Sequence, residues 1–125
     1  MKIFNKKSDS WSENLNFVDE NNVVLGYDYS QDWCEQFGYW FSSDPQGKEK
    51  LEELEIVELD AFVFDTSYFE EDATNEYFEE GGSMTFRMAA GVRELFLTLY
   101  NGHNGYYGHG WDITEHGKIL ESGRL

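Results

Sequence analysis

The clearest pattern along the chain is an alternation of apolar and polar residues, which is typical of β-strands with one buried face. Residues 15–19 and 23–29 alternate in this way and are separated by a short polar stretch that contains two asparagines. Asparagine tolerates the positive φ angles of tight turns, so this region predicts a β-hairpin. Residues 83–89 and 92–101 alternate again on either side of a turn at Ala90-Gly91, and they predict a second pair of strands.

Four further stretches predict shorter or less regular strands, at residues 39–41, 55–66, 106–114 and 119–121. In residues 55–66 both faces are largely apolar, which favours a central strand. Asn104-Gly105 is a strong two-residue turn signal. We therefore expect residues 92–101 and 106–114 to form a hairpin.

The remaining segments lack this alternation. Residues 1–12 contain three lysines and little periodicity, so they are expected to form a loosely ordered N-terminal arm. Residues 48–55 carry a thin apolar stripe at helical spacing and predict a helix of about two turns. Residues 69–82 are acidic and rich in turn-forming residues, and predict a surface loop.

These elements predict a mainly β fold, with an α+β arrangement as the alternative. A chain of 125 residues fits one domain. We expect residues 13–125 to form a single compact domain of six to eight short, mostly antiparallel strands with one or two short helices. The arrangement would be sandwich-like or barrel-like.

Charge changes the picture more than any motif. The chain has 25 acidic and nine basic residues, a formal net charge of -16, and fourteen of the acidic residues lie within residues 44–80. Such a chain repels nucleic acid and anionic membrane surfaces and attracts basic proteins. The candidate binding residues in this acidic stretch are Glu52, Glu53, Glu55, Glu58, Asp60, Glu70, Glu71, Asp72, Glu76, Glu79 and Glu80. The alternative is a solvated face that has no partner.

Two other groups of residues could carry chemistry. Cys34, the single cysteine, could join His103 and His109 in a metal site, although no diagnostic ligand spacing is present. The alternative for His109 is a packed, hydrogen-bonded histidine, because it shares a strand face with Trp111 and Ile113.

The glycines around the expected second hairpin suggest a further site. They could leave the rings of Tyr106, Tyr107 and Trp111 open as a binding platform. The alternative is that the glycines only permit turns and close strand approach.

The chain has no apolar run long enough for a membrane helix and no apolar signal-peptide core after its basic N-terminus. A single cysteine excludes an internal disulfide. We therefore expect a cytoplasmic protein that requires no cofactor and does not bind membranes.

Three segments together resemble a family of small uncharacterised phage and bacterial proteins. They are Gln31-Asp32-Trp33-Cys34-Glu35, Met84-Thr85-Phe86-Arg87-Met88-Ala89 and Leu99-Tyr100-Asn101-Gly102-His103-Asn104-Gly105-Tyr106-Tyr107. Their order and approximate spacing are similar to the family pattern from about residue 23 to residue 113. Trp33 departs from it, because that family usually has the first of two cysteines there, and His103 stands where a small residue is usual. The resemblance implies a compact β-rich domain and a phage or prophage origin, but no activity.

The expected function is therefore a non-enzymatic binding protein whose acidic face, within residues 44–80, contacts a basic protein. A phage-derived inhibitor that mimics nucleic acid would be one version of it. The alternatives are a small metal-binding protein or metal-dependent enzyme that uses Cys34, His103 and His109, and a structural or assembly protein. The sequence does not determine the oligomeric state.

Overall fold

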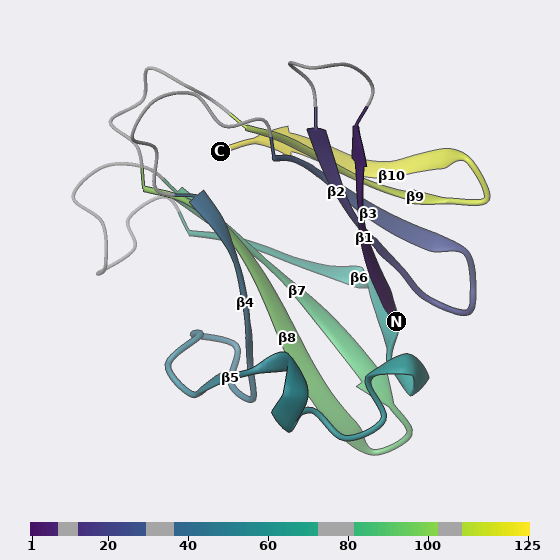
Figure 1. The fold of residues 1–125 in the computed structure, drawn as a ribbon, viewed down its shortest axis with the longest axis vertical. Helices are drawn as coiled ribbons and strands as arrows, with labels where there is room; N and C mark the ends of the chain where they lie inside the picture. Colours follow the sequence, from purple (N-terminus) through teal and green to yellow (C-terminus); the bar gives the residue numbers. More distant parts are fainter. Residues whose placement is uncertain (8–12, 30–36, 73–81, 103–108) are drawn as a thin grey trace.

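The computed structural model describes residues 1–7, 13–29, 37–72, 82–102 and 109–125, and these form two antiparallel five-stranded sheets (Figure 1). The first sheet has the order β1-β2-β3-β9-β10, with β1 (Lys2–Lys7), β2 (Glu13–Val18), β3 (Val23–Asp28), β9 (Gly110–Glu115) and β10 (Lys118–Arg124). The second has the order β5-β4-β8-β7-β6, with β4 (Phe37–Ser42), β5 (Lys50–Leu51), β6 (Val63–Asp72), β7 (Gly82–Ala90) and β8 (Arg93–Asn101). The mainly β, single-domain prediction is confirmed.

The two sheets enclose an aromatic core. Phe17 of β2 meets the ring of Tyr39 edge-on at 5.0 Å and that of Phe41 at 6.5 Å, both on β4 of the other sheet. Phe86 of β7 and Trp111 of β9 make a similar contact at 5.3 Å. Edge-to-face pairs of this kind stabilise a packed interface beyond the area that they bury.

The alternating stretches became strands as expected. Residues 15–19 and 23–29 correspond to the β2–β3 hairpin, in which Leu15 pairs with Tyr27 and Asn22 adopts a φ of 59° in the turn. Residues 83–89 and 92–101 correspond to β7 and β8, joined at Gly91 with a φ of 65°. Both hairpin predictions are confirmed, because β2 pairs antiparallel with β3, and β7 with β8.

The third predicted hairpin is wrong. β8 pairs with β4 and β7 of the second sheet, whereas β9 pairs with β3 and β10 of the first, so the chain crosses between sheets after β8. The whole of Leu95–Leu99 is buried, and both edges of β8 are already occupied by other strands. The turn signal at Asn104-Gly105 lies outside the described residues.

Two 3₁₀ turns stand where a helix and the first part of a strand were expected. The expected helix over residues 48–55 is wrong, and the strand expected over residues 55–66 is correct only from Val63 onwards. Before it, the chain forms the short strand β5, then η1 (Glu53–Glu55) and η2 (Leu59–Ala61). β6 begins only at Val63 and lies at a sheet edge, not at its centre. Ile56, Leu59 and Phe62 pack against the core, and Leu59 and Phe62 lie at the two ends of the single turn of η2, which has about three residues per turn.

The expected N-terminal arm over residues 1–12 is ordered over β1, which pairs with β2 along its whole length. Lysines predict poor burial but do not prevent an edge strand, and charged side chains are common on exposed edges. The expected surface loop over residues 69–82 begins later, because β6 continues to Asp72 and Gly82 already belongs to β7. Residues 73–81 lie outside the described part.

A buried carboxylate joins the two sheets at one end. Asp19 follows β2 and is 4% exposed. Its Oδ1 accepts the backbone N–H groups of Asn21 and Val23, at 2.9 and 3.0 Å. Its Oδ2 accepts the backbone N–H of Phe64 in β6 at 2.8 Å. One side chain therefore fixes the β2–β3 turn of the first sheet and the start of β6 in the second.

Candidate functional site

The acidic segment, defined as residues 49–60, leads from β5 towards β6 at one end of the sandwich (Figure 1). It carries six exposed acidic residues: Glu49, Glu52, Glu53, Glu55, Glu58 and Asp60. Its only basic residue is Lys50, so its formal charge is one minus six, or -5. This density of like charge on one surface produces a negative potential that attracts basic partners.

Hydrogen bonds hold the acidic segment in one conformation. Glu52 and Glu55 form a reciprocal capping box across η1. Arg93, at the start of β8, donates a hydrogen bond to the backbone carbonyl of Val57 and lies 3.6 Å from the carboxylate of Glu58. Because Glu58 has a left-handed φ of 56°, an uncommon conformation for a non-glycine residue, this support fixes the turn between η1 and η2.

Tyr39 ties the segment to the core. Its ring packs on Phe17, and its hydroxyl donates a hydrogen bond to Glu53. Burial, followed by the hydrogen bond to Glu53, raises the pKa of the Tyr39 phenol well above its ordinary value. The hydrogen bond from this hydroxyl holds the Glu53 carboxylate against the sandwich.

The same end exposes apolar side chains. Leu54 and Val57 in the acidic segment are 101% and 67% exposed, and Val92 in the β7–β8 turn is 101% exposed. Val92 precedes Arg93, which contacts Val57, so the two segments lie together at this end. Among the described residues, the other large exposed apolar side chains, Phe4 and Ile119, belong to the first sheet. These three residues are not identifiable from the sequence, because Leu54, Val57 and Val92 each fall in a stretch whose pattern predicts a helix or a strand with a buried apolar side.

A turn rich in backbone hydrogen bonds precedes the acidic segment. Asp44 accepts the N–H groups of Glu49 and Lys48 at 2.7 and 3.0 Å. Partial burial opposes ionisation of Asp44, but these backbone hydrogen bonds outweigh it and lower its pKa. Gly47 has a φ of 72°, and a Cβ there would lie 2.7 Å from the indole nitrogen of Trp40. The carboxylate of Asp44 therefore accepts its hydrogen bonds from the backbone of its own turn.

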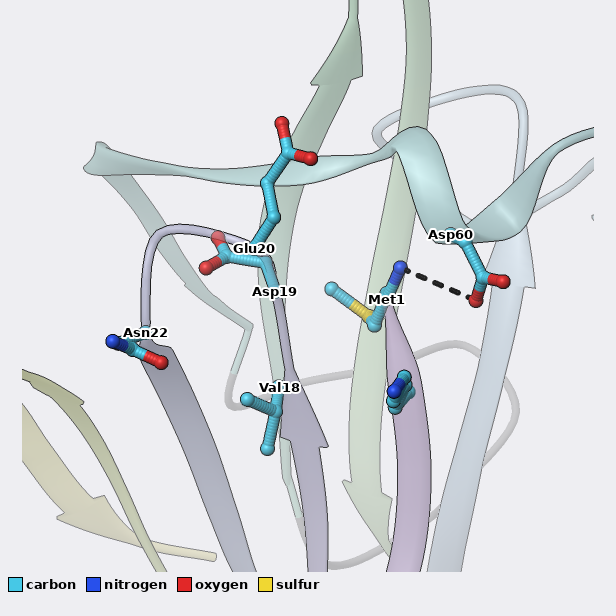
Figure 2. A pocket seen from close by; sticks show the side chains of 7 residues that line it. Met1, Val18, Asp19, Glu20, Asn22 and Asp60 are labelled. Carbon is cyan, nitrogen blue, oxygen red and sulfur yellow. Dashed lines mark ion pairs between the residues drawn. The ribbon is translucent and has the colours of Figure 1, made fainter.

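A cavity of about 380 Å³ lies between the β2–β3 turn and η2 (Figure 2). Asp19, Glu20 and Asn22 line it from the hairpin side, and Met1 and Asp60 from the opposite side. The amino group of Met1 donates a hydrogen bond to the carbonyl of Leu59 at 2.8 Å and lies 3.8 Å from Asp60 Oδ1. The three hydrogen bonds that Asp19 accepts give its carboxylate a structural role in the cavity wall.

The other candidate acidic residues are less fully placed. Glu70, Glu71 and Asp72 belong to β6 and pair along the backbone with Thr85, Met84 and Ser83 of β7. Their side chains, and the whole of Glu76, Glu79 and Glu80, lie outside the described residues. The acidic surface that the structure describes is therefore the segment at residues 49–60.

Trp111 is a core residue. It is 6% exposed, packs edge-on against Phe86 and pairs with Gly123 of β10, where a Cβ would lie 2.9 Å from its ring. This corrects the expectation that Trp111 forms part of an exposed aromatic platform. Tyr106 and Tyr107, the other two candidates, lie outside the described residues.

His109 is also packed. It is 2% exposed and stacks on Phe37 with the ring centres 4.2 Å apart. Its Nδ1 donates to the carbonyl oxygen of Asp28 at 2.6 Å, because a carbonyl oxygen can only accept. No group of three or more potential metal ligands occurs among the described residues. Cys34 and His103 lie outside them.

Arg87 neutralises two carboxylates beside the second sheet. Its guanidinium lies 3.1 Å from Asp65 Oδ2 and 2.8 Å from Glu94 Oε1. Asp65 also accepts hydrogen bonds from the hydroxyl and N–H of Ser67, at 2.6 and 3.0 Å. The hydrogen bonds from Ser67 are the main cause of a lowered pKa of the Asp65 carboxyl, with Arg87 contributing further. These acids contribute less to the negative surface than those of the acidic segment.

Asp65 should make the stability of the protein depend on pH. Because its folded pKa lies below its unfolded value, ionised Asp65 stabilises the fold above about pH 4. That contribution is lost as pH falls through the lower, folded pKa. We expect Asp65→Asn to lower the free energy of unfolding at neutral pH, and the difference from the wild type should shrink as pH falls below about 4. Urea unfolding of the wild type and of Asp65→Asn across this pH range measures the difference in free energy of unfolding. A difference that does not change with pH would contradict a stabilising role of the ionised Asp65 carboxylate.

No helix in the described part of the chain combines the length and apolar character needed to cross a membrane. Comparisons with protein-family models, with curated proteins and with solved structures found no match to this chain.

Proposed function

We propose that this is a non-enzymatic binding protein whose acidic segment contacts a basic surface of a protein partner in the cytoplasm. The observation that carries the proposal is the display of six exposed acidic residues on one short segment that is fixed by Arg93 and Tyr39. A fixed segment loses less conformational entropy on binding than a mobile one. Carboxylates at the rim would mainly accelerate association and select basic partners.

The resemblance to phage proteins suggests a specific version of this function. The partner would then be a host protein whose lysines and arginines normally contact nucleic acid, and the acidic segment would occupy the same surface. Binding of this kind should weaken as salt rises, because screening shortens the reach of surface charges. Double-stranded DNA should also compete with the protein for its partner.

The test compares two variants with the same net charge. Glu55→Gln/Glu58→Gln/Asp60→Asn changes the acidic segment, whereas Asp112→Asn/Glu115→Gln/Glu121→Gln changes β9 and β10 of the first sheet. Each raises the formal charge by three, from -16 to -13. In affinity capture from a bacterial lysate at low salt, we expect basic proteins retained by the wild type to be lost with the first variant and kept with the second.

Equal loss with both variants would mean that net charge alone attracts those proteins, and it would contradict a localised site. Retention that persists at about 0.5 M salt in both variants would contradict an electrostatic contact. Circular dichroism of each variant checks that the fold is unchanged.

A further inference from the structure

The exposed apolar residues at the acidic end require a physical explanation. Leu54 and Val92 are fully exposed, and Val57 is 67% exposed. Single exposed apolar side chains are ordinary on protein surfaces, but several at one place commonly mark a site of interaction. Val57 and Val92 lie at the point where Arg93 joins the acidic segment to the β7–β8 turn, and Leu54 precedes Val57 by three residues in the same segment.

The backbone that presents these side chains is held in place. Arg93 donates to the carbonyl of Val57, and its guanidinium also lies 4.9 Å from the ring centre of the buried Phe62. Val92 lies in the tight turn at Gly91, between two central strands of the second sheet. Apolar side chains on a fixed backbone can be buried by a partner with little additional ordering.

The charges around these residues decide what could cover them. A second copy that placed its own apolar residues on them would bring two acidic segments together, each with a formal charge of -5, and this would be repulsive. A partner segment that carries lysine or arginine beside its apolar side chains has the complementary pattern. Protein interfaces commonly combine an apolar centre with such a charged rim.

We infer that Leu54, Val57 and Val92 form the apolar centre of the binding surface, and that it accepts a basic amphipathic segment of the partner. This inference rests on the proposed function and specifies the kind of partner. In it, the carboxylates attract the partner segment, and burial of the apolar centre slows its dissociation.

Two synthetic peptides of equal charge test the inference. One is an amphipathic helix of leucine and lysine, and the other has glutamine in place of every leucine. We expect wild-type protein to bind the leucine peptide more tightly. Leu54→Ser/Val92→Ser should weaken binding of the leucine peptide by about 10-fold or more and leave binding of the glutamine peptide unchanged within about twofold.

The control is Phe4→Ser/Ile119→Ser, which removes two exposed apolar side chains from the first sheet. It should bind both peptides as the wild type does. Equal affinity of the Leu54/Val92 variant and the wild type for the leucine peptide would overturn the inference, as would an equal loss in the control. If the wild type bound neither peptide at low salt, the proposed function itself would fail.

Discussion

Replacing Asp19 by alanine is expected to lower the free energy of unfolding by about 3–5 kcal/mol. The carboxylate is buried and accepts three backbone N–H groups, of which those of Val23 and Phe64 are themselves buried. A buried N–H without an acceptor costs about 1–3 kcal/mol, and hydrogen bonds to an ionised acceptor are the stronger kind. Alanine removes all three acceptor contacts together. It also separates the β2–β3 turn from the start of β6.

Asp19→Asn divides this effect into parts. The single amide oxygen can still accept the N–H groups of Asn21 and Val23, but the amide nitrogen cannot accept the N–H of Phe64. We therefore expect about half the loss caused by alanine. Urea unfolding at fixed pH, followed by circular dichroism and by tryptophan fluorescence, measures both variants and checks for two-state behaviour.

The neighbouring Glu20→Ala provides the matched control, because Glu20 is exposed. It should change the free energy of unfolding by less than about 0.5 kcal/mol. A loss at Asp19 as small as this would show that the hydrogen bonds of Asp19 do not join the two sheets.

Local parts of this arrangement can be predicted from the sequence. An aspartate two residues before Asn21 is typical of a turn that its own carboxylate caps, and the β2–β3 hairpin was identified from its alternation. The bond from Phe64 could not be identified, because Phe64 lies 45 residues away and no local pattern relates the two. The same limit explains the wrong hairpin after β8, since turn chemistry specifies a local bend and strand pairing depends on the whole sheet.

Periodicity accounts for the other differences. Strands with one apolar side were found because a period of two is visible in six residues, as in β3. β1 is not recognisable in the sequence because its lysines and asparagine obscure that period, and β5 is not because it has only two residues. In residues 56–62 the residues that pack against the core are three apart, but Val57, Leu59 and Ala61 also alternate with the acidic Glu58 and Asp60, which is the period of a strand. Two short 3₁₀ turns were therefore interpreted as part of a strand.

The candidate site was predictable only as a concentration of charge. The sequence shows where the carboxylates are, and the structure shows that those of residues 49–60 are exposed on a fixed segment. The apolar centre could not be predicted, because leucine and valine are residue types that are usually buried, and Leu54 and Val57 are exposed here. Arg93 could not be related to them either, because its contact with Val57 spans 36 residues.

Trp111→Ala is expected to lower the free energy of unfolding by about 3–5 kcal/mol, the range for truncating a large aromatic residue in a core. Trp111 is nearly fully buried, and its ring contacts Phe86 of the opposite sheet. An exposed platform residue would give a loss below about 1 kcal/mol, so the measurement separates a structural from a surface role. Trp111→Phe keeps part of the packing and should lose less.

Gly123→Ala tests the same packing from the other side. Gly123 pairs with Trp111, and an added Cβ would lie 2.9 Å from three atoms of the indole, closer than packed atoms can approach. The ring or β10 must then shift, at a cost of about 1–3 kcal/mol.

Gly117→Ala is an unsuitable control because of its φ of 81°, whereas Ser122→Ala changes an exposed neighbour on the same strand. Because Trp111→Ala removes the ring that the new methyl would strike, adding Gly123→Ala to that variant should cost less than adding it to the wild type. If the losses in free energy of unfolding were additive, contact with the indole would not be the reason that residue 123 is a glycine.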